Sequence, residues 1–340
     1  MKICTYIHPQ AFGQSQKRLG ILLEDNRIID PNFCWAMDYE REGFRNHYER
    51  ANRKLPSSLS ELLLYHDDAF EALEESYGLF LFLQKVGDLS LRDGTPIFFH
   101  LDDDSLKLGC PIDKITSYRD FYAHEKHVAK GFEKRGEPIP PAWYEIPAYY
   151  KGSTQGFIGP SDEILWPSYT DQLDYELEFG MIIGREGINI KEEDAFDHIF
   201  GYTILNDISA RDIQRKEMAI RLGPAKGKDF CSILGPVIVT KDEFGDSEPN
   251  LLMTAKVNGV EWSRGYSGET HFDFCKMITH VAQDEWIMPG DLFGSGTVGT
   301  GCGLELDKWI QPGDKLTLEI EGIGELTNIV GSKRETHGKF

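Results

Sequence analysis

The sequence predicts an α+β protein dominated by β-strands, in which a small N-terminal αβ domain precedes a larger β-rich domain. The chain has 340 residues, of which 40% are hydrophobic and 27% charged, enough for the cores of one large domain and a smaller one. From about residue 113, glycine and proline become frequent and short apolar or alternating segments recur, which is typical of strands between turns. We therefore expect the two domains to cover residues 1–112 and 113–335.

The first domain is expected to combine short strands with a long helical stretch. Residues 1 to about 55 look strand-like, because β-rich pieces such as MKICTYI and RLGILLED alternate with polar turns. Ser58 and Glu61 have the spacing of a helix capping box. Apolar residues then recur at helical spacing as far as Lys85, so the strands should be followed by helix.

The second domain is expected to consist mainly of strands, with short helices between them. Its candidate strands are the segments YELEFGMIIG, GYTILND, GPVIVT, LLMTAKVNG and KLTLEIEGIG, which are apolar throughout or alternate with period two. Short helices fit at 120–134, 192–199 and 270–283.

Charge and cysteine usage limit the partners and the compartment. The formal net charge of -20 disfavours binding to nucleic acid or to an anionic membrane surface. No apolar run approaches the roughly 18 residues of a membrane span, and the start MKICTYIHPQ turns polar too early for a signal peptide. The six cysteines are scattered without a C-x-x-C pair, which favours reduced thiols. These features predict a cytoplasmic protein.

The segment LDYELEFG at 173–180 carries three carboxylates at alternating positions. On a strand, Asp174, Glu176 and Glu178 would share one face, while the opposite face is aromatic or leucine. The segment continues into the apolar run MIIG, which indicates an interior strand. Buried carboxylates require a cation, and oxygen ligands select a hard one such as Mg²⁺, Ca²⁺ or Mn²⁺. The alternative is a solvated strand face.

A further acidic position follows the next apolar strand. The strand YTIL ends at Asn206–Asp207, and a helix is expected to begin near Ser209. Arg211 and Gln214 lie three residues apart and so share a helix face. The segment could therefore form the edge of a site, or Asp207 or Ser209 could simply cap the helix.

Histidines cluster in the segment YRDFYAHEKH at 118–127. Asp120 is expected to open a helix that points Tyr122 and His127 inward. A lone histidine is more often a packing or surface residue than a catalytic base. His124 and His127 also have the spacing of an H-x-x-H metal pair, although nothing else in the sequence indicates zinc.

Two glycine-rich segments complete the candidate site. The segment 222–232 combines glycines with Lys226 and Lys228, and it lacks the P-loop pattern. The segment 294–305 is expected to be a loop whose amides could bind an anion, ending at Glu305 on a new strand.

In this order, these segments resemble the fumarylacetoacetate hydrolase family. The resemblance is carried by YRDFYAHEKH, WYEIPAYYKG, LDYELEFGMIIG, NDISARDIQ, LGPAKGKDF and PGDLFGSGTVGTG, and it runs from about residue 113 to about 330. It implies a homodimer whose catalytic domain is a mixed β-sandwich or β-roll with flanking helices. The N-terminal third resembles the family only loosely.

The resemblance also implies roles for individual residues. It places one divalent cation per subunit, Mg²⁺, Ca²⁺ or Mn²⁺, between Asp120, Glu176, Glu178 and Asp207, and implies no organic cofactor. His127 aligns with the general base and Glu305 with the acid that orients it. The positions that hold substrate or stabilise charge are Tyr122, Arg135, Tyr150, Arg211, Gln214, Lys228 and Thr297.

Two further positions bear on the substrate and on a second ion. Ser232 falls near a hydroxyl that helps to hold a second ion in the family. Met218 stands where mammalian-type enzymes have a tyrosine that contacts substrate. The resemblance therefore does not establish fumarylacetoacetate itself as the substrate.

The predicted function is metal-dependent hydrolysis of a carbon–carbon bond in a 1,3-diketo acid, of the fumarylacetoacetate, fumarylpyruvate or acylpyruvate type. His127 would activate the attacking water, and Lys228 would stabilise the oxyanion. One alternative is decarboxylation, isomerisation or hydration of a 2-oxo acid by a member of the same superfamily. Another is a non-catalytic β-domain stabilised by Ca²⁺.

Overall fold

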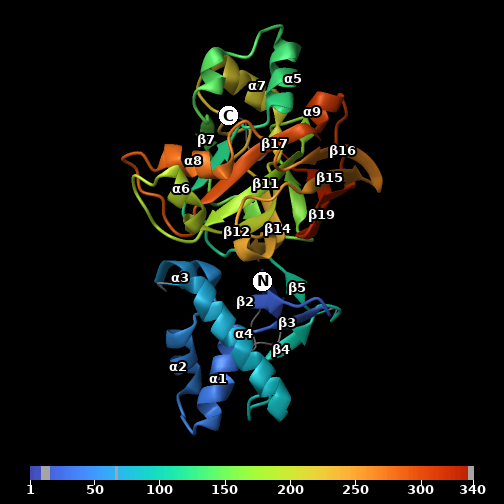
Figure 1. The fold of residues 1–340 in the computed structure, drawn as a ribbon. Coiled ribbons are helices and arrows are strands. Elements are labelled where there is room, and N and C mark those ends of the chain that lie inside the picture. The colour runs from blue at the N-terminus through green and yellow to red at the C-terminus, as the bar shows by residue number, and fades with distance from the viewer. Residues whose placement is uncertain (9–15, 66–67, 104, 336–340) are drawn as a thin grey trace. The chain divides into compact units, whose positions relative to one another are not determined.

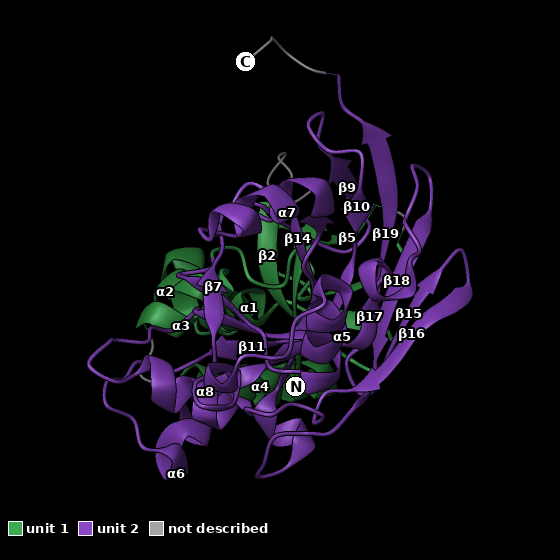
Figure 2. Ribbon diagram, turned by 90° about the horizontal axis from the view of Figure 1, so that it is seen from above, with its two compact units in different colours: residues 1–114 green, residues 115–340 purple. Residues whose placement is uncertain are grey.

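The computed structural model describes residues 1–8, 16–65, 68–103 and 105–335, and the chain forms two compact units, Met1–Lys114 and Ile115–Phe340 (Figures 1 and 2). Each unit is described by itself. Within the described residues, no helix has both the length and the apolar character needed to cross a membrane. All six cysteines are free thiols.

The first unit pairs a small antiparallel sheet with helices. Its sheet has the order β4-β3-β2-β1, with β5 beside β1. The strands are β1 (Lys2–His8), β2 (Gln16–Leu22), β3 (Arg27–Ile29), β4 (Phe98–His100) and β5 (Lys107–Leu108). The helices are α1 (Pro31–Arg41), α2 (His47–Lys54), α3 (Leu59–Tyr65) and α4 (Ala69–Val86).

The expectation of strand-like structure up to residue 55 was wrong after residue 30. Helix α1 begins at Pro31, and the side chain of Asp30 caps it by accepting a hydrogen bond from Phe33 N at 2.8 Å. This pair is a helix start, because proline is pre-organised for the first helical turn. The predicted cap of the later helix forms, since Glu61 N donates to Ser58 Oγ at 3.1 Å.

The main sheet of the second unit places β11 at its centre. Its strands follow the order β14-β12-β11-β17-β6-β7, with β8 beside β14. Every residue of β11 is buried, as the apolar continuation into MIIG indicates. The strands are β6 (Tyr118–Phe121), β7 (Tyr149–Lys151), β8 (Phe157–Ile158), β11 (Glu176–Ile183), β12 (Ile199–Asn206), β14 (Ser232–Thr240) and β17 (Leu292–Cys302).

A second sheet and short helices complete this unit (Figure 1). The second sheet has the order β16-β15-β18-β19-β9, and a short ladder pairs β10 with β13. These strands are β9 (Glu163–Trp166), β10 (Leu173–Asp174), β13 (Ser209–Ala210), β15 (Leu252–Val257), β16 (Val260–Tyr266), β18 (Lys315–Ile320) and β19 (Gly324–Lys333). The helices are α5 (Glu125–Arg135), α6 (Glu192–Ala195), α7 (Arg211–Ile220), α8 (Phe274–Val281) and α9 (Gly303–Leu306), with 3₁₀ turns η2 (Pro141–Tyr144), η3 (Phe196–His198) and η4 (Lys241–Phe244). The predicted strand-rich α+β class is confirmed.

Three local expectations in this unit were wrong. Asp120 does not open a helix, because it lies in strand β6, and α5 begins only at Glu125 with His124 as its N-cap. The glycine-rich segment 294–305 was expected to be a loop, but most of it belongs to the long strand β17, in which Gly294 pairs with Asp120. Glu305 lies on the short helix α9 and not on a strand.

Candidate active site and metal centre

Four buried carboxylates meet at the end of the main sheet. Asp120 lies on β6, Glu176 and Glu178 lie on β11, and Asp207 directly follows β12. Each offers a ligand oxygen, and these oxygens all lie within 4.8 Å of one another. The most exposed of the four residues retains only 5% of its accessible surface. We call these four residues the carboxylate cage.

The cage has the character of a site for a hard divalent cation. Asp120 Oδ1 and Glu178 Oε2 are buried, and neither has a hydrogen-bond partner among the residues that the structure describes. They lie side by side, since a Cβ built on Gly294 would be 2.6 Å from the first and 3.0 Å from the second. Two facing carboxylate oxygens require a shared proton or a cation. Because the donor set is all oxygen, Mg²⁺, Mn²⁺ or Ca²⁺ fits it.

The ionisation of the cage carboxyls follows from their neighbours. Burial, reinforced by like charge from Asp207 and Asp120 respectively, holds the pKa values of Asp120 and Glu178 well above their usual range. Burial also opposes ionisation of Glu176, but Lys228, Arg211 and His127 lower the pKa of Glu176 below its usual range. The cage therefore has two carboxyls that need a cation to ionise.

Two buried cations border the cage. Lys228 Nζ donates to both Glu176 and Asp207. At the start of α7, Arg211 donates from Nη2 to Glu176 Oε1 at 2.8 Å and from Nε to Asp174 Oδ2 at 2.8 Å. Both cations therefore compensate the charge of Glu176, the cage residue that both of them contact.

Asp174 does not join the cage, although the alternating pattern predicted that it would share a face with Glu176 and Glu178. It accepts hydrogen bonds from the backbone N–H groups of Gly303 at 2.8 Å and Leu304 at 3.0 Å, at the start of α9. Tyr175 separates β10 from β11, and the pairing with β17 shifts register between Glu176 and Glu178. Asp174 thereby fixes α9, which carries Glu305.

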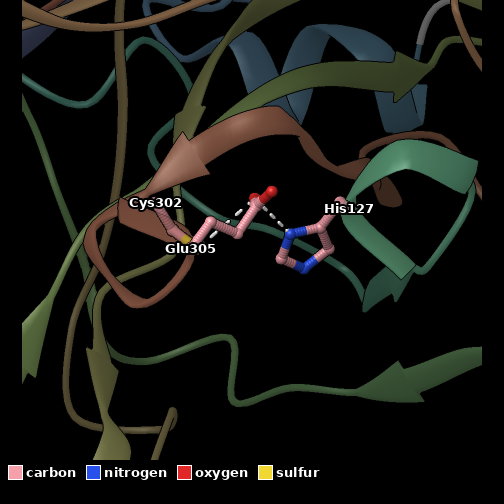
Figure 3. A group of neighbouring side chains, drawn as sticks. All are labelled: His127, Cys302 and Glu305. Atoms are coloured by element: carbon pink, nitrogen blue, oxygen red, sulfur yellow. Dashed lines mark hydrogen bonds and ion pairs between the residues drawn. The ribbon is translucent and has the colours of Figure 1, made fainter. Parts of the chain in front are cut away.

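His127 and Glu305 form a hydrogen-bonded pair beside the cage. His127 Nδ1 lies 2.6 Å from Glu305 Oε1 (Figure 3). The other carboxylate oxygen, Oε2, accepts from Thr300 N at 2.9 Å. Cys302, the backbone partner of Glu176 in the sheet, donates from Sγ to Glu305 Oε1 at 3.6 Å. Since a carboxylate can only accept, it orients Nδ1–H and leaves Nε2 to act as a base.

Hydroxyl groups complete the surroundings of the cage. Tyr150 donates to Asp207 Oδ2 at 2.6 Å, and Ser232 donates to Asp207 Oδ1 at 3.2 Å. Thr297 donates to Glu178 Oε1 at 3.1 Å. The structure thus brings Tyr150, Thr297 and Ser232 directly onto cage ligands.

The remaining predicted residues lie farther from the cage. Gln214 contacts it only through Arg211, whose Nη1 donates to Gln214 Oε1 at 2.9 Å. Tyr122 packs its ring edge-on against His127, with ring centroids 5.3 Å apart. Arg135 is the last residue of α5 and has a half-exposed side chain. Burial raises the pKa of the Tyr122 hydroxyl to about 12, and the charge of Arg135 opposes this rise. Met218 is half-exposed on α7.

Sequence reasoning missed two contributors to the site, Thr300 and Cys302, and expected a different role for Asp174. Burial raises the pKa of the Cys302 thiol well above its usual range, so this side chain is a neutral donor. Its proximity to Glu305 in the sequence was the available signal. Neither Asp207 nor Ser209 caps α7, because the N-cap is Ala210 and no side chain accepts there.

The chain belongs to the fumarylacetoacetate hydrolase family. The model of the family's C-terminal domain, described as "Fumarylacetoacetate (FAA) hydrolase C-terminal", matches residues 116–331. This range includes the whole carboxylate cage and the His127–Glu305 pair. The predicted family membership is therefore confirmed, and with it the membership of an enzyme family.

Similar curated proteins are named as tautomerases. The oxaloacetate tautomerase YisK of Bacillus subtilis is 37% identical over 163 residues, which cover 48% of this chain and 53% of the relative. The mitochondrial oxaloacetate tautomerase fahd2 of Xenopus laevis is 35% identical over 194 residues, covering 57% and 59%. The chain therefore spans between half and two thirds of these relatives, and the predicted hydrolase class remains a prediction.

Solved structures share the fold over nearly the whole chain. A fumarylacetoacetate hydrolase from Exiguobacterium antarcticum has a TM-score of 0.67 at 23% identity, covering 97% of this chain and 99% of that chain. A maleylpyruvate hydrolase from Sphingobium has a TM-score of 0.66 at 18% identity, covering 98% and 100%. At this identity the likeness concerns the fold alone.

Proposed function

We propose that this chain is a divalent-metal-dependent enzyme that interconverts the keto and enol forms of a 2-oxo dicarboxylic acid such as oxaloacetate. The observation that carries the proposal is the His127–Glu305 hydrogen bond beside a cage of four buried carboxylates. Relatives that are 35% and 37% identical are named oxaloacetate tautomerases. Tautomerisation needs a base next to a polarised carbonyl group of the substrate. In this site His127 would be the base, and a cation in the cage would polarise the carbonyl group.

The residues of the chain take distinct parts in this reaction. A divalent cation in the cage would supply Lewis-acid polarisation of the 2-oxo oxygen. His127 Nε2 removes a proton from the carbon next to the carbonyl, the enolate oxygen takes up a proton from water to give the enol, and the reverse reaction undoes both transfers. Glu305 holds the imidazole in one tautomer and stabilises the imidazolium that forms.

Positive side chains counter the negative charge that develops on the substrate. Lys228 and Arg211 are buried beside Glu176, where charge interactions are screened less than in water. Although both are paired with carboxylates, together with a cation in the cage they would help to stabilise the oxyanion of the enolate.

A second candidate is the hydrolysis of a carbon–carbon bond in a 1,3-diketo acid. The observation that favours it is again the pairing of His127 with a carboxylate, since such a pair can remove a proton from water as well as from carbon. Both reactions use the same enolate stabilisation. Separate assays must therefore distinguish them.

The test follows the disappearance of enol-oxaloacetate by its ultraviolet absorbance, with Mg²⁺ or Mn²⁺ and after chelation. The His127→Ala variant should lose about 10²- to 10⁴-fold in rate, as is typical for the loss of a general base. His280→Ala, on α8, serves as the control and should retain the wild-type rate. A His127→Ala enzyme that tautomerises at the wild-type rate would contradict the proposal.

Parallel assays distinguish the other reactions. Acylpyruvate and fumarylpyruvate cleavage would indicate the hydrolase, and release of CO₂ from oxaloacetate would indicate a decarboxylase. If the cation raises the melting temperature but no 2-oxo acid is converted, the cage is a structural site instead.

A further inference from the structure

Three side chains beside the cage form a group with different metal-binding chemistry. His127 from α5, Cys302 from β17 and Glu305 from α9 point toward one another in Figure 3. Cys302 Sγ is 3.6 Å from Glu305 Oε1, and His127 Nδ1 is 2.6 Å from the same oxygen. Their ligand atoms all lie within 4.8 Å of one another.

The ligand types of this group differ from those of the carboxylate cage. A thiol, an imidazole and a carboxylate together suit Zn²⁺, which readily takes sulfur and nitrogen ligands, whereas the all-oxygen cage suits Mg²⁺ or Mn²⁺. Ligand atoms around a tetrahedral zinc ion lie roughly 3 to 4 Å apart, given its bond lengths. The Cys302–Glu305 distance of 3.6 Å falls in this range, whereas the His127–Glu305 contact of 2.6 Å would have to open to admit an ion.

A cavity borders the group at Glu305. Glu305 and Thr300 line a cavity of about 310 Å³ together with Lys126, Lys130 and Arg264. These three cations do not repel an incoming metal ion strongly, because each is paired with a carboxylate. The pairs are Lys126 with Glu269, Lys130 with Glu133, and Arg264 with Glu261.

We propose that His127, Cys302 and Glu305 form a second metal site, for zinc or a similar thiophilic ion, whose occupation switches off the proton-transfer pair. The ion displaces the thiol proton into solvent and takes the place of the hydrogen at His127 Nδ1, so that the ring carries its hydrogen at Nε2. An imidazole in this state cannot act as a base. The fourth ligand is a water molecule from the cavity, as in other zinc sites with three protein ligands. The inhibitory effect rests on the proposed function, whereas the binding of the ion does not.

The binding test uses Co²⁺ as a spectroscopic stand-in for Zn²⁺, added to the full-length protein in the presence of excess Mg²⁺. Binding at this site produces a sulfur-to-cobalt charge-transfer band, which a cobalt ion in the carboxylate cage cannot produce because the cage has no sulfur. Added Zn²⁺ should abolish the band by competition.

Two variants locate the ion. Cys302→Ser should abolish the band and weaken Zn²⁺ binding by more than about 10-fold, since even the loss of a residue that only supports a ligand costs 10- to 100-fold. Cys275→Ser is the matched control, because Cys275 is a partly exposed thiol beside Glu248 on α8, and it should keep the band. Glu305→Gln keeps the shape of the side chain and should also weaken binding, which provides a test if Cys302→Ser does not fold.

The activity test measures the Zn²⁺ sensitivity of each variant relative to its own rate with Mg²⁺ alone. Wild-type and Cys275→Ser enzymes should be inhibited at the Zn²⁺ concentration that abolishes the cobalt band, and Cys302→Ser should resist at least 10-fold more Zn²⁺. A wild-type protein without the band, or a band that survives in Cys302→Ser, would overturn the second site. A band without inhibition of an active enzyme would overturn the switch. If no 2-oxo acid is converted at all, the proposed function fails while the cobalt band still decides the site.

Discussion

At the scale of single residues, Asp120 and Glu178 differ from the other cage carboxylates. Glu176 and Asp207 each receive a hydrogen bond from Lys228, and a network of this kind needs no metal ion. Asp120 Oδ1 and Glu178 Oε2 instead have no donor among the described residues. Because an unpaired buried carboxylate is costly, these two oxygens are the observation that favours a metal ion in the cage.

His124 offers a prediction on the pH dependence of stability. Burial, with a smaller contribution from nearby His127, lowers the pKa of His124 to about 3. Below pH ~6.5 the unfolded chain binds a proton that the folded chain does not bind, so stability falls as the pH falls. His124→Gln removes this effect. Between pH 7 and pH 5, the wild-type protein should lose about 2 kcal/mol more unfolding free energy than the variant does.

Urea unfolding of both proteins at several pH values measures this difference. Other titrating groups contribute equally to both proteins and cancel in the comparison. Parallel curves for wild type and variant between pH 7 and pH 5 would contradict a buried neutral His124.

The strand pattern pointed to Glu176 and Glu178, because carboxylates within apolar strands are rare enough to be informative, and it left the role of Asp207 open. Asp120 was expected on a helix, so it entered the predicted ligand set only through the family resemblance. The strand pattern did not predict the separate role of Asp174. Strict alternation implies one shared face, but Tyr175 interrupts the strand and the register shifts between Glu176 and Glu178. A register irregularity depends on the partner strand, which single-sequence reasoning does not see.

At the scale of elements, the close approach of β17 to β6 depends on Gly294. A Cβ at this position would lie 2.6 Å from Asp120 Oδ1 and 2.7 Å from Leu205 Cδ2. Gly294→Ala should therefore push the Asp120 carboxylate out of position and lower Mn²⁺ or Mg²⁺ affinity by about 10- to 100-fold, the cost typical of misplaced ligands.

Calorimetric titration with Mn²⁺ measures this loss, and circular dichroism checks that the variant folds. Gly78→Ala on α4 is a matched control, because a Cβ there meets no atom within 4 Å. Unchanged affinity in a folded Gly294→Ala protein would contradict the placement of Asp120 in the cage.

The start of α7 is held in place by the buried guanidinium of Arg211. Replacing it with methionine leaves Asp174 and Glu176 without their shared cation, and loss of one partner of a buried ion pair typically costs about 3–5 kcal/mol. Arg215→Met, at an exposed position on the same helix, should cost less than about 1 kcal/mol. Urea unfolding of both variants tests the contrast, and equal losses would argue against a buried network.

Elements were predicted unevenly. The central strand β11 and the helical stretch after Ser58 were predicted because their periodicity is strong. Strand β6 was mistaken for a helix, since YRDF is short and its strand character comes from pairing with β17 and β7. Strand β17 was mistaken for a loop because glycines are rare in strands, except where backbones approach closely.

At the scale of the whole molecule, metal binding should stabilise one unit selectively. Every cage ligand lies in the unit Ile115–Phe340. A ligand at 100 times its dissociation constant adds about 2.7 kcal/mol to the stability of the state that binds it. Hydrogen exchange should therefore slow in β6, β11 and β12 when Mg²⁺ is added, and β1, β2 and β3 should exchange as before.

Mass spectrometry measures the exchange rates of peptides from both units in one experiment, once with Mg²⁺ and once with a chelator. Equal slowing in both units, or no slowing in β11, would contradict a metal site confined to the cage. The division at residue 114 makes the first unit an internal control.

The two members of the proposed proton-transfer pair, His127 and Glu305, are 178 positions apart in the chain. A nascent or truncated polypeptide that stops before α9 can hold every cage ligand and still lack the carboxylate that orients the imidazole. On the proposed function, such a chain should therefore turn over substrate far more slowly than one that includes α9. If the proposed function holds, an activity assay therefore also reports whether α9 has joined the site.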